Sequence, residues 1–460
     1  MSSYPLFSVV RELAELIVDL VLSDTKAYVD DNIVDCSIAI NEEKIFKIGK
    51  EANMPRAQTK IDLRNLLVLP GLIDAHVHLR DEGKAYKEDF YSGTAAAAAG
   101  GITTVLDMPN NDPVTMSAET LRNRMEMAQG KILVDVGFYS EFPKNLEAIK
   151  EIVREGVVAF KLFMAEQVGG LNIDDDGALL EAFKAVGLKV PIAVHAEDKK
   201  LLKETQGELR RTKCNGVEAF LKAHSVNVEV RAVERLLSIL RQVDVHVHFC
   251  HMSTEDGLKT IIDGKKSGLK VTCEVTPHHL FLSVDDLKRI GTLALTVPPL
   301  REKRNVEALW NGVKNNWIDI FASDHAPHNL IEKKAEVVWN VKAGVPGLEI
   351  TLPLLLTEVN RGRLTIADVV RLMAKKPAQI FNLKGRGSLK EGNKADLVVV
   401  DLKRKGEIDV SKFHSKAKYS PFDGWKIEGK PVKTFVGGRL IVDEGEVIAE
   451  AGSGQIIKRG

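Results

Sequence analysis

Side chains that can bind metal ions recur at the ends of short β-branched segments in the middle of this chain. His76 and His78 lie two residues apart in one such segment, and residues two apart in a strand share a face. Together with donors from later segments they suit two divalent cations, with zinc as the default ion. The candidate ligands are His76, His78, Lys161, His195, His251 and Asp324.

Lys161 is the unusual member of this set, because an ammonium group would repel two cations. Reaction of its amine with carbon dioxide would give a carbamate, whose two oxygens can bridge a metal pair. We therefore expect two Zn²⁺ ions per subunit, joined by a carboxylated Lys161. The alternative is a lysine that forms a buried salt bridge.

The spacing of these residues follows an alternation of strands and helices. Eight short apolar segments recur at intervals of a few tens of residues, each followed by a helix-like segment. This alternation predicts an α/β fold, a (β/α)8 TIM barrel whose active site lies at the carboxyl ends of the strands. The predicted strands are residues 72–78, 102–107, 134–138, 157–163, 191–195, 243–250, 269–275 and 317–323.

Turn-bounded β-rich segments occupy both ends of the chain and are too small to form separate domains. Residues 17–70 and 385–460 are therefore expected to pair into one small composite β-sandwich domain, beside a barrel domain of residues 71–384. Within the barrel, capping boxes mark two helix starts, at Ser283 with Asp286 and at Thr365 with Asp368.

The overall composition argues against several function classes. Of the 460 residues, 44% are hydrophobic and 28% are charged, which predicts a folded globular chain. Lys plus Arg and Asp plus Glu each total 64, so the basic excess typical of proteins that bind nucleic acid or anionic membranes is missing. Four cysteines are too few for a disulfide framework and favour a cytoplasmic location. Charged residues interrupt the apolar segment 13–22, so neither a secretory peptide nor a membrane span is expected.

Three motifs resemble those of a known family. They are Pro70-Gly-Leu-Ile-Asp-Ala-His-Val-His-Leu-Arg80, Asp107-Met-Pro-Asn110 and Ser323-Asp-His-Ala-Pro-His328. They are similar to motifs of the amidohydrolase superfamily and, more narrowly, of the dihydroorotases of the longer type. The resemblance implies a barrel of the metal-dependent hydrolase type. It also implies the reversible, zinc-dependent cyclisation of N-carbamoyl-L-aspartate to L-dihydroorotate in pyrimidine biosynthesis.

The same resemblance implies a role for each site residue. His76 and His78 would hold the first metal and His195 and His251 the second, with carboxylated Lys161 as the bridge. Asp324 would contact the first metal and act as the catalytic acid and base. The substrate carboxylate would be bound by Arg80, Asn110 and His328, and backbone groups near Val297, Pro346 and Gly347 would contact the ring edge.

Several further residues have two interpretations. Cys250 and Glu274 resemble a pair near an extra zinc in the animal multifunctional dihydroorotases, so they are a possible third metal site. A buried thiol and a structural carboxylate are the alternative. His246 and His248 form a second His-x-His pair, and strict strand parity allows either this pair or His251 to face inward, but not both. The resemblance selects His251. His224 is interpreted as a surface residue.

Two other functions remain open at this point. An allantoinase or a hydantoinase of the dihydropyrimidinase type would share the metal ligands, although the combination of Arg80 with Asn110 argues against them. A catalytically inactive relative that binds aspartate carbamoyltransferase is a different class, but such relatives typically lose ligands, and every ligand position here is filled. We expect a homo-oligomer that acts on a small molecule, with a possible association with aspartate carbamoyltransferase.

Overall fold

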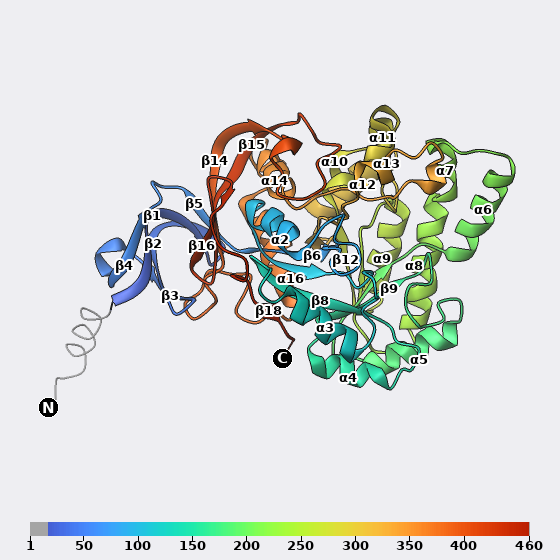
Figure 1. The fold of residues 1–460 in the computed structure, drawn as a ribbon, viewed down its shortest axis with the longest axis horizontal. Coiled ribbons are helices and arrows are strands. Elements are labelled where there is room, and N and C mark those ends of the chain that lie inside the picture. Colours follow the sequence, from blue (N-terminus) through green and yellow to red (C-terminus); the bar gives the residue numbers. More distant parts are fainter. Residues whose placement is uncertain (1–16, 460) are drawn as a thin grey trace.

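The computed structural model describes residues 17–459, which form a barrel and a second, separate sheet (Figure 1). The first four residues of the segment 13–22, on which the expectation of no secretory peptide rests, lie outside the described residues. No helix within residues 17–459 is both long and apolar enough to cross a bilayer.

Eight parallel strands form the barrel in sequence order, as predicted. The register between neighbours is parallel throughout, and the last strand meets the first through the segment that follows it: His78 N–H donates to His325 O over 2.8 Å. The strands are β6 (Leu72–Val77), β7 (Ile102–Asp107), β8 (Asp135–Glu141), β9 (Ala159–Phe163), β10 (Ile192–His195), β11 (Val247–Phe249), β12 (Val271–Val275) and β13 (Ile320–Phe321).

The strands β11 and β13 are much shorter than the predicted segments 243–250 and 317–323. β13 has only two residues, since its neighbour Asp319 accepts the Cys273 N–H with its side chain, over 2.8 Å. The carboxylate there takes the place of one backbone hydrogen bond between the two strands, and a pattern of apolar residues does not predict this.

The predicted capping boxes at Ser283 and Thr365 are confirmed, and each starts a helix.

Helices cover the outside of the barrel after each strand, so that the β-branched residues pack between the two layers. The helices that follow the first five strands are α2 (Phe90–Ala99), α3 (Ala118–Ala128), α4 (Ala148–Glu155), α5 (Asp176–Val186), α6 (Lys199–Arg211), α7 (Val217–Ala223) and α8 (Val226–Leu240). Those that follow the last three are α9 (Glu255–Lys266), α10 (Pro277–Phe281), α11 (Val284–Ile290), α12 (Lys303–Lys314), α13 (Leu330–Lys333), α14 (Thr351–Asn360), α15 (Ile366–Val370) and α16 (Lys376–Ile380).

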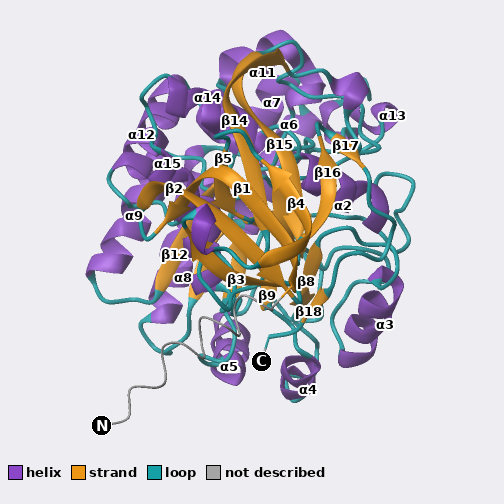
Figure 2. Ribbon diagram, turned by 90° about the vertical axis from the view of Figure 1, so that its left-hand side faces the viewer, coloured by secondary structure: helices purple, strands orange, loops and turns teal. Residues whose placement is uncertain are grey.

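Both chain ends contribute to the second sheet, which faces the viewer in Figure 2. Its order is β17-β16-β15-β14-β5-β1-β2-β3, with β4 paired to β1. The strands are β1 (Ile17–Val29), β2 (Asn32–Asn41), β3 (Lys44–Gly49), β4 (Arg56–Asp62), β5 (Leu67–Pro70), β14 (Leu397–Glu407), β15 (Lys426–Val436), β16 (Arg439–Asp443) and β17 (Glu446–Val447).

This sheet curls over its own core and packs its other face on the barrel. Ile40 of β2 shares a buried cluster with Val399 and Phe435 of strands that are not its neighbours. The opposite face, with Val398 and Val400, joins the barrel core beside α2. The Ala-rich helix α2 lies in between, because its small side chains let both sheets approach closely.

The chain end departs from the expected domain boundary. Strand β18 (Ile456–Ile457) was expected within the composite domain, but it pairs in parallel with β8 of the barrel. β8 pairs with β9 only from Tyr139 onward, so its earlier residues have a free edge. Val136 N–H donates to Gln455 O over 3.0 Å at that edge, and the chain end thereby extends the barrel sheet.

Candidate metal centre and active site

The mouth of the barrel holds a cavity of about 420 Å³ between the carboxyl ends of the strands. Polar side chains from six strands and the loops that follow them form its floor and one wall. The polar residues that line it include His76, His78, Arg80, Asn110, Lys161, Glu166, His195, Lys203, Gln206, His224, His251, Asp324 and His328. All six predicted metal ligands are therefore brought together.

The ring nitrogens of the histidines converge on two points. His76 Nε2 and His78 Nε2 each lie 3.3 Å from Asp324 Oδ1. On the other side, His195 Nδ1 lies 3.0 Å from His251 Nε2. Burial lowers the pKa values of His76 and His251, which favours the neutral imidazoles that bind metals.

The far nitrogens of these rings are held by oxygens outside the centre. His76 Nδ1 hydrogen-bonds Glu274, and His195 Nε2 lies 2.8 Å from Glu197 Oε2. His78 Nδ1 lies 2.7 Å from Asn110 Oδ1. Such outer partners fix the ring orientation and the tautomer of metal-binding histidines.

His251 reaches the centre through an unusual backbone conformation. It follows β11 with a φ of 33°, a region that non-glycine residues rarely adopt. This turn lets His248 and His251 both point inward, so the expectation that strand parity allows only one of them is wrong. His248 Nε2 lies 3.0 Å from Glu274 Oε2, below the cavity.

Lys161 is fully buried on β9 and has no carboxylate within hydrogen-bond distance among the described residues. Its Nζ donates to Cys250 Sγ over 3.0 Å. The alternative of a buried salt bridge therefore finds no support in the geometry. An ammonium at this point would be surrounded by imidazoles and a thiol.

The donor set fits divalent cations. Nitrogen and oxygen atoms of His76, His251 and Asp324 lie within 4.8 Å of one another, and His251 Nδ1 is buried without a hydrogen-bond partner. Borderline nitrogen and oxygen donors at such spacing are the ligands that zinc prefers. A second group within the same distance is His76, Cys250 and Glu274.

Glu274 also has another role in this geometry. Its carboxylate accepts from His76, from His248 and from the His251 N–H, the last over 3.1 Å. Burial opposes ionisation, but the two imidazoles outweigh it and lower the pKa of Glu274. Burial raises the pKa of the Cys250 thiol to about 12, which disfavours the thiolate that binds metal. Glu274 is thus placed to orient ligands.

A positively charged wall lies beside the histidines. Arg80 is 7% exposed, its Nε is buried without a partner, and its Nη2 lies 3.4 Å from His328 Nε2. Lys87 Nζ donates to His328 Nδ1 over 3.1 Å. Burial, with Arg80 and Lys87 next, lowers the pKa of His328, so its ring is neutral. No carboxylate among the described residues contacts the Arg80 guanidinium.

The segment that carries Arg80 is fixed from behind by a buried ion pair. Asp107 Oδ1 accepts the Leu79 N–H over 2.8 Å, and Asp107 pairs with Arg124. Arg124 also donates to the Asp81 carbonyl, so both neighbours of Arg80 are held. Arg80 itself has a φ of 64°, which turns its side chain toward the cavity wall.

The remaining predicted contacts are only partly in place. Val297 lines the cavity, but Pro346 and Gly347 are not among the described residues that line it. Gly347 N–H donates to His325 Nδ1 over 3.1 Å, so its donor is already used. The wall is formed by Ala343 and Gly344 instead.

Two residues near the centre were not identified from the sequence. Glu197 lies two residues after His195 and is buried, and His224 Nδ1 lies 2.8 Å from its Oε1. The interpretation of His224 as a surface residue is wrong, since it is 4% exposed. The His195-Ala-Glu197 spacing was a usable signal for Glu197. His224 ends a separate helix, α7, and no local pattern marks it.

Comparison with known proteins agrees with this architecture. The model of the amidohydrolase family matches residues 67–441. A dihydroorotase of Methanothermobacter thermautotrophicus is 38% identical over 93% of this chain and 95% of its own length. A dihydroorotase of Pyrococcus horikoshii is 37% identical over 96% of each chain.

A similar solved structure is that of the L-hydantoinase (dihydropyrimidinase) from Arthrobacter aurescens. It has a TM-score of 0.92 and 32% identity, over 96% of this chain and 100% of that one. The family match covers most of the chain, and the family is metal-dependent, as the cluster of donors requires. The chain therefore belongs to the amidohydrolase family.

Proposed function

We propose that this protein is a dihydroorotase, which interconverts N-carbamoyl-L-aspartate and L-dihydroorotate in pyrimidine biosynthesis. One observation supports a dihydroorotase in particular and not only a cyclic amide hydrolase: within residues 17–459, no carboxylate pairs with the buried guanidinium of Arg80 beside the metal-type cluster. A buried cation without a partner is costly unless a ligand supplies the anion. Dihydroorotate has a ring carboxylate that would supply it.

The alternative substrates lack this group. Hydantoins and dihydropyrimidines are uncharged at the corresponding position, and they would leave Arg80 without a counter-ion, whereas the neighbouring Lys87 already pairs with Glu332 over 2.8 Å. The planar fork of arginine matches a carboxylate through two parallel hydrogen bonds. The Asn110 oxygen accepts from His78, which leaves its amide nitrogen free to donate to the same carboxylate.

The proposal includes two zinc ions held by His76, His78, His195 and His251, with Asp324 on the first and carboxylated Lys161 between them. Bound zinc would polarise the amide carbonyl and supply a nucleophilic water near neutral pH. Lys161 contacts Cys250 and no carboxylate of the part of the chain that the structure describes, which supports the carbamate, since it would provide the shared negative charge. Glu274 and Glu197 would hold the imidazoles in the tautomers that face the metals.

Asp324 is the proposed proton carrier. Its Oδ1 lies between the His76 and His78 rings at the edge of the cavity, and burial raises the pKa of its carboxyl. A carboxyl with a raised pKa gives up and takes back a proton more readily near neutral pH. It would deliver that proton to the ring nitrogen in hydrolysis and take it from the ureido nitrogen in cyclisation.

A four-substrate assay of the purified protein tests this function. L-Dihydroorotate, allantoin, hydantoin and dihydrouracil are compared as substrates, and N-carbamoyl-L-aspartate is tested in the cyclisation direction. We expect kcat/KM for dihydroorotate to exceed the other values by at least about a hundredfold, which corresponds to about 2.7 kcal/mol. Faster turnover of an uncharged ring would overturn the proposal in favour of a hydantoinase.

The remaining expectations form part of the same proposal. All four cysteines are free, which supports a cytoplasmic location. A homo-oligomer and an association with aspartate carbamoyltransferase are tested by light scattering of the protein, alone and mixed with that enzyme. An inactive partner protein would bind aspartate carbamoyltransferase without retaining metal or turning over dihydroorotate.

A further inference from the structure

One lysine near the active site is completely buried without an acidic partner. Lys333 ends α13, and its ammonium donates to the carbonyls of Leu295, over 3.1 Å, and Gly344, over 2.8 Å. No carboxylate forms an ion pair with it within residues 17–459. Burial lowers the pKa of Lys333 to about 7, a sign of how poorly its charge is compensated. Burying such a group costs free energy, so we expect this lysine to have a specific role.

Lys333 and a tyrosine donate to the same backbone carbonyl group. Tyr419 OH donates to the same Gly344 carbonyl over 3.1 Å, and Lys333 Nζ lies 5.6 Å from the centre of the Tyr419 ring. Gly344 N–H in turn donates to the Leu295 carbonyl over 2.8 Å. One ammonium and one hydroxyl thus join two loops that come from distant parts of the sequence.

These two loops form the substrate side of the cavity. Ala343 and Gly344 line it, as does Val297 of the other loop. The Ala343 carbonyl accepts from His328 Nε2 over 3.1 Å, and the same nitrogen lies 3.4 Å from Arg80. A shift of the loop would therefore displace the histidine that supports the guanidinium.

Tyr419 belongs to a connection between two strands of the second sheet and not to the barrel. It lies in the connection between β14 and β15, which extends from the composite sheet across the barrel (Figure 1). Ser415 of the same connection hydrogen-bonds Glu88, which is buried and contacts His325 over 3.3 Å. The composite sheet thus reaches the loops that surround the active site.

We propose that Lys333 and Tyr419 form a buried clamp that positions Ala343 and Gly344 as the substrate-facing wall of the active site. Both are positioning residues, because each acts on the loop and neither lines the cavity. The wall holds His328 against Arg80, and the clamp thereby sets the site for the ring carboxylate. This inference rests on the proposed function for the identity of the substrate, but the clamp itself does not depend on it.

Amide hydrogen exchange tests the clamp independently of activity. The holoenzyme is compared with Lys333→Met, Tyr419→Phe and the double variant. We expect the amides of residues 343–345 and 347 to exchange at least about tenfold faster in each variant, while those of β9 and β10 are unchanged. Lys26→Met and Tyr28→Phe, which alter a lysine and a tyrosine of the composite sheet, are matched controls. Unchanged exchange in the loop, or an equal increase throughout the barrel, would overturn the clamp.

Kinetics test its consequence for the substrate. In the variants, KM for dihydroorotate should rise about tenfold with a smaller change in kcat and full metal content. Because both donors act on one carbonyl, the double variant should lose less than the product of the two single effects. A lower Tm with an unaltered KM would show that both residues have only a structural role. Tyr419→Phe removes a single oxygen and keeps the test decisive if Lys333→Met fails to fold.

The two possible failures are distinguishable. If the unaltered enzyme does not turn over dihydroorotate, the proposed function is wrong, and the exchange experiment still decides the clamp. If the enzyme is active and the loop exchanges at the same rate in all variants, the function stands and the clamp is wrong.

Discussion

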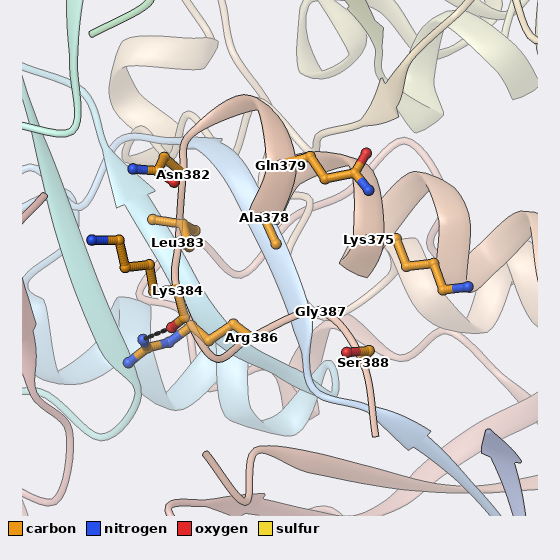
Figure 3. Close-up of a pocket in the computed structure, with 9 residues that line it drawn as sticks. All are labelled: Lys375, Ala378, Gln379, Asn382, Leu383, Lys384, Arg386, Gly387 and Ser388. Atoms are coloured by element: carbon orange, nitrogen blue, oxygen red, sulfur yellow. Dashed lines mark hydrogen bonds between the residues drawn. The ribbon is translucent and has the colours of Figure 1, made fainter. Parts of the chain in front are cut away.

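The two ends of the barrel contain cavities of equal size and very different chemistry. Each has a volume of about 420 Å³. The mouth gathers imidazoles beside a guanidinium that no carboxylate of the described residues contacts. The opposite end, beside α16, is lined by nine residues between positions 375 and 388, and three of these nine have cationic side chains (Figure 3). There Lys375 pairs with Asp31 and Arg386 with Asp135, so two of the three charges are already matched. The volume of a cavity therefore does not identify the active site. The metal-type ligands that converge beside the guanidinium of Arg80 do identify it.

The backbone shows the same contrast. At the mouth, Arg80, His251 and Asp324 adopt positive φ angles of 64°, 33° and 46°. Non-glycine residues rarely do so, and the strain is concentrated at positions that serve the site. At the other end the positive φ angles belong to Asn382, Gly385 and Gly387, at 52°, 70° and 81°, which are residue types that adopt this region more readily. The mouth thus has positive φ angles at residues that rarely adopt them, and the opposite end has them at residues that tolerate them.

The largest expected effect comes from Lys161→Ala. Without the shared anion, the two cations would be held only by neutral imidazoles and Asp324, so the variant should lose most bound metal and nearly all turnover. Metal analysis by mass spectrometry and the dihydroorotate assay measure both. Two full equivalents of metal in a folded variant would contradict the carbamate bridge.

Asp324→Asn should also remove nearly all activity, in both directions, while the fold persists. General acid and base catalysis contributes about 10²- to 10⁴-fold, and the amide cannot carry the proton. Circular dichroism checks the fold, and the two progress curves check the activity. Residual turnover within tenfold of the unaltered enzyme would exclude Asp324 as the proton carrier.

Arg80→Met should change substrate choice and leave the metals in place. A hydrogen bond to a charged group contributes about 1.5–3 kcal/mol, so kcat/KM for dihydroorotate should fall about tenfold to a hundredfold. Any residual hydrolysis of uncharged dihydrouracil should be little affected. An equal loss of kcat/KM for both substrates would mean that Arg80 supports the architecture of the site. The hydantoinase alternative would then be favoured.

The sequence predicted the barrel and the ligand set because both follow from short-range spacing. His76 and His78 share a face through the two-residue repeat of a strand, and the ends of parallel strands meet at one mouth. The inward position of His251 together with His248 was not predictable, since it depends on a positive φ that no residue pattern signals. Similarly, His224 contacts Glu197 through the packing of a separate helix.

Elements whose partners lie far along the chain were also missed. β18 pairs with β8, more than 300 residues away in sequence, through an unfilled edge that appears only when the barrel has closed. Lys333 stands between the charged residues Glu332 and Lys334 in the sequence, a pattern typical of an exposed segment, although it is fully buried. Its carbonyl partners come from loops about 11 and 38 residues distant, and their approach depends on the complete fold.

The unmatched charge of Lys333 predicts a pH dependence of stability. Its pKa is lowered to about 7 in the folded state, so above pH 7 the unfolded chain binds more protons at this residue. Stability should therefore rise with pH, by about 1 kcal/mol between pH 7 and pH 8 relative to Lys333→Met. Urea unfolding of both proteins at the two pH values measures the difference. If the free energies of unfolding of the unaltered protein and of Lys333→Met changed equally between the two pH values, the buried ammonium without an acidic partner would be contradicted.

The smallest expected effect on catalysis belongs to the opposite end of the barrel. Arg386→Met removes a partner of the fully buried Asp135 and should lower the free energy of unfolding by about 1–3 kcal/mol. Because that pair lies far from the mouth, kcat, KM and metal content should stay within about twofold. Lys384→Met, in the same cavity, should change neither stability nor catalysis beyond about 0.5 kcal/mol. A tenfold fall in kcat/KM for Lys384→Met would break the contrast between the two ends, since the cavity beside α16 would then act on the active site through the barrel.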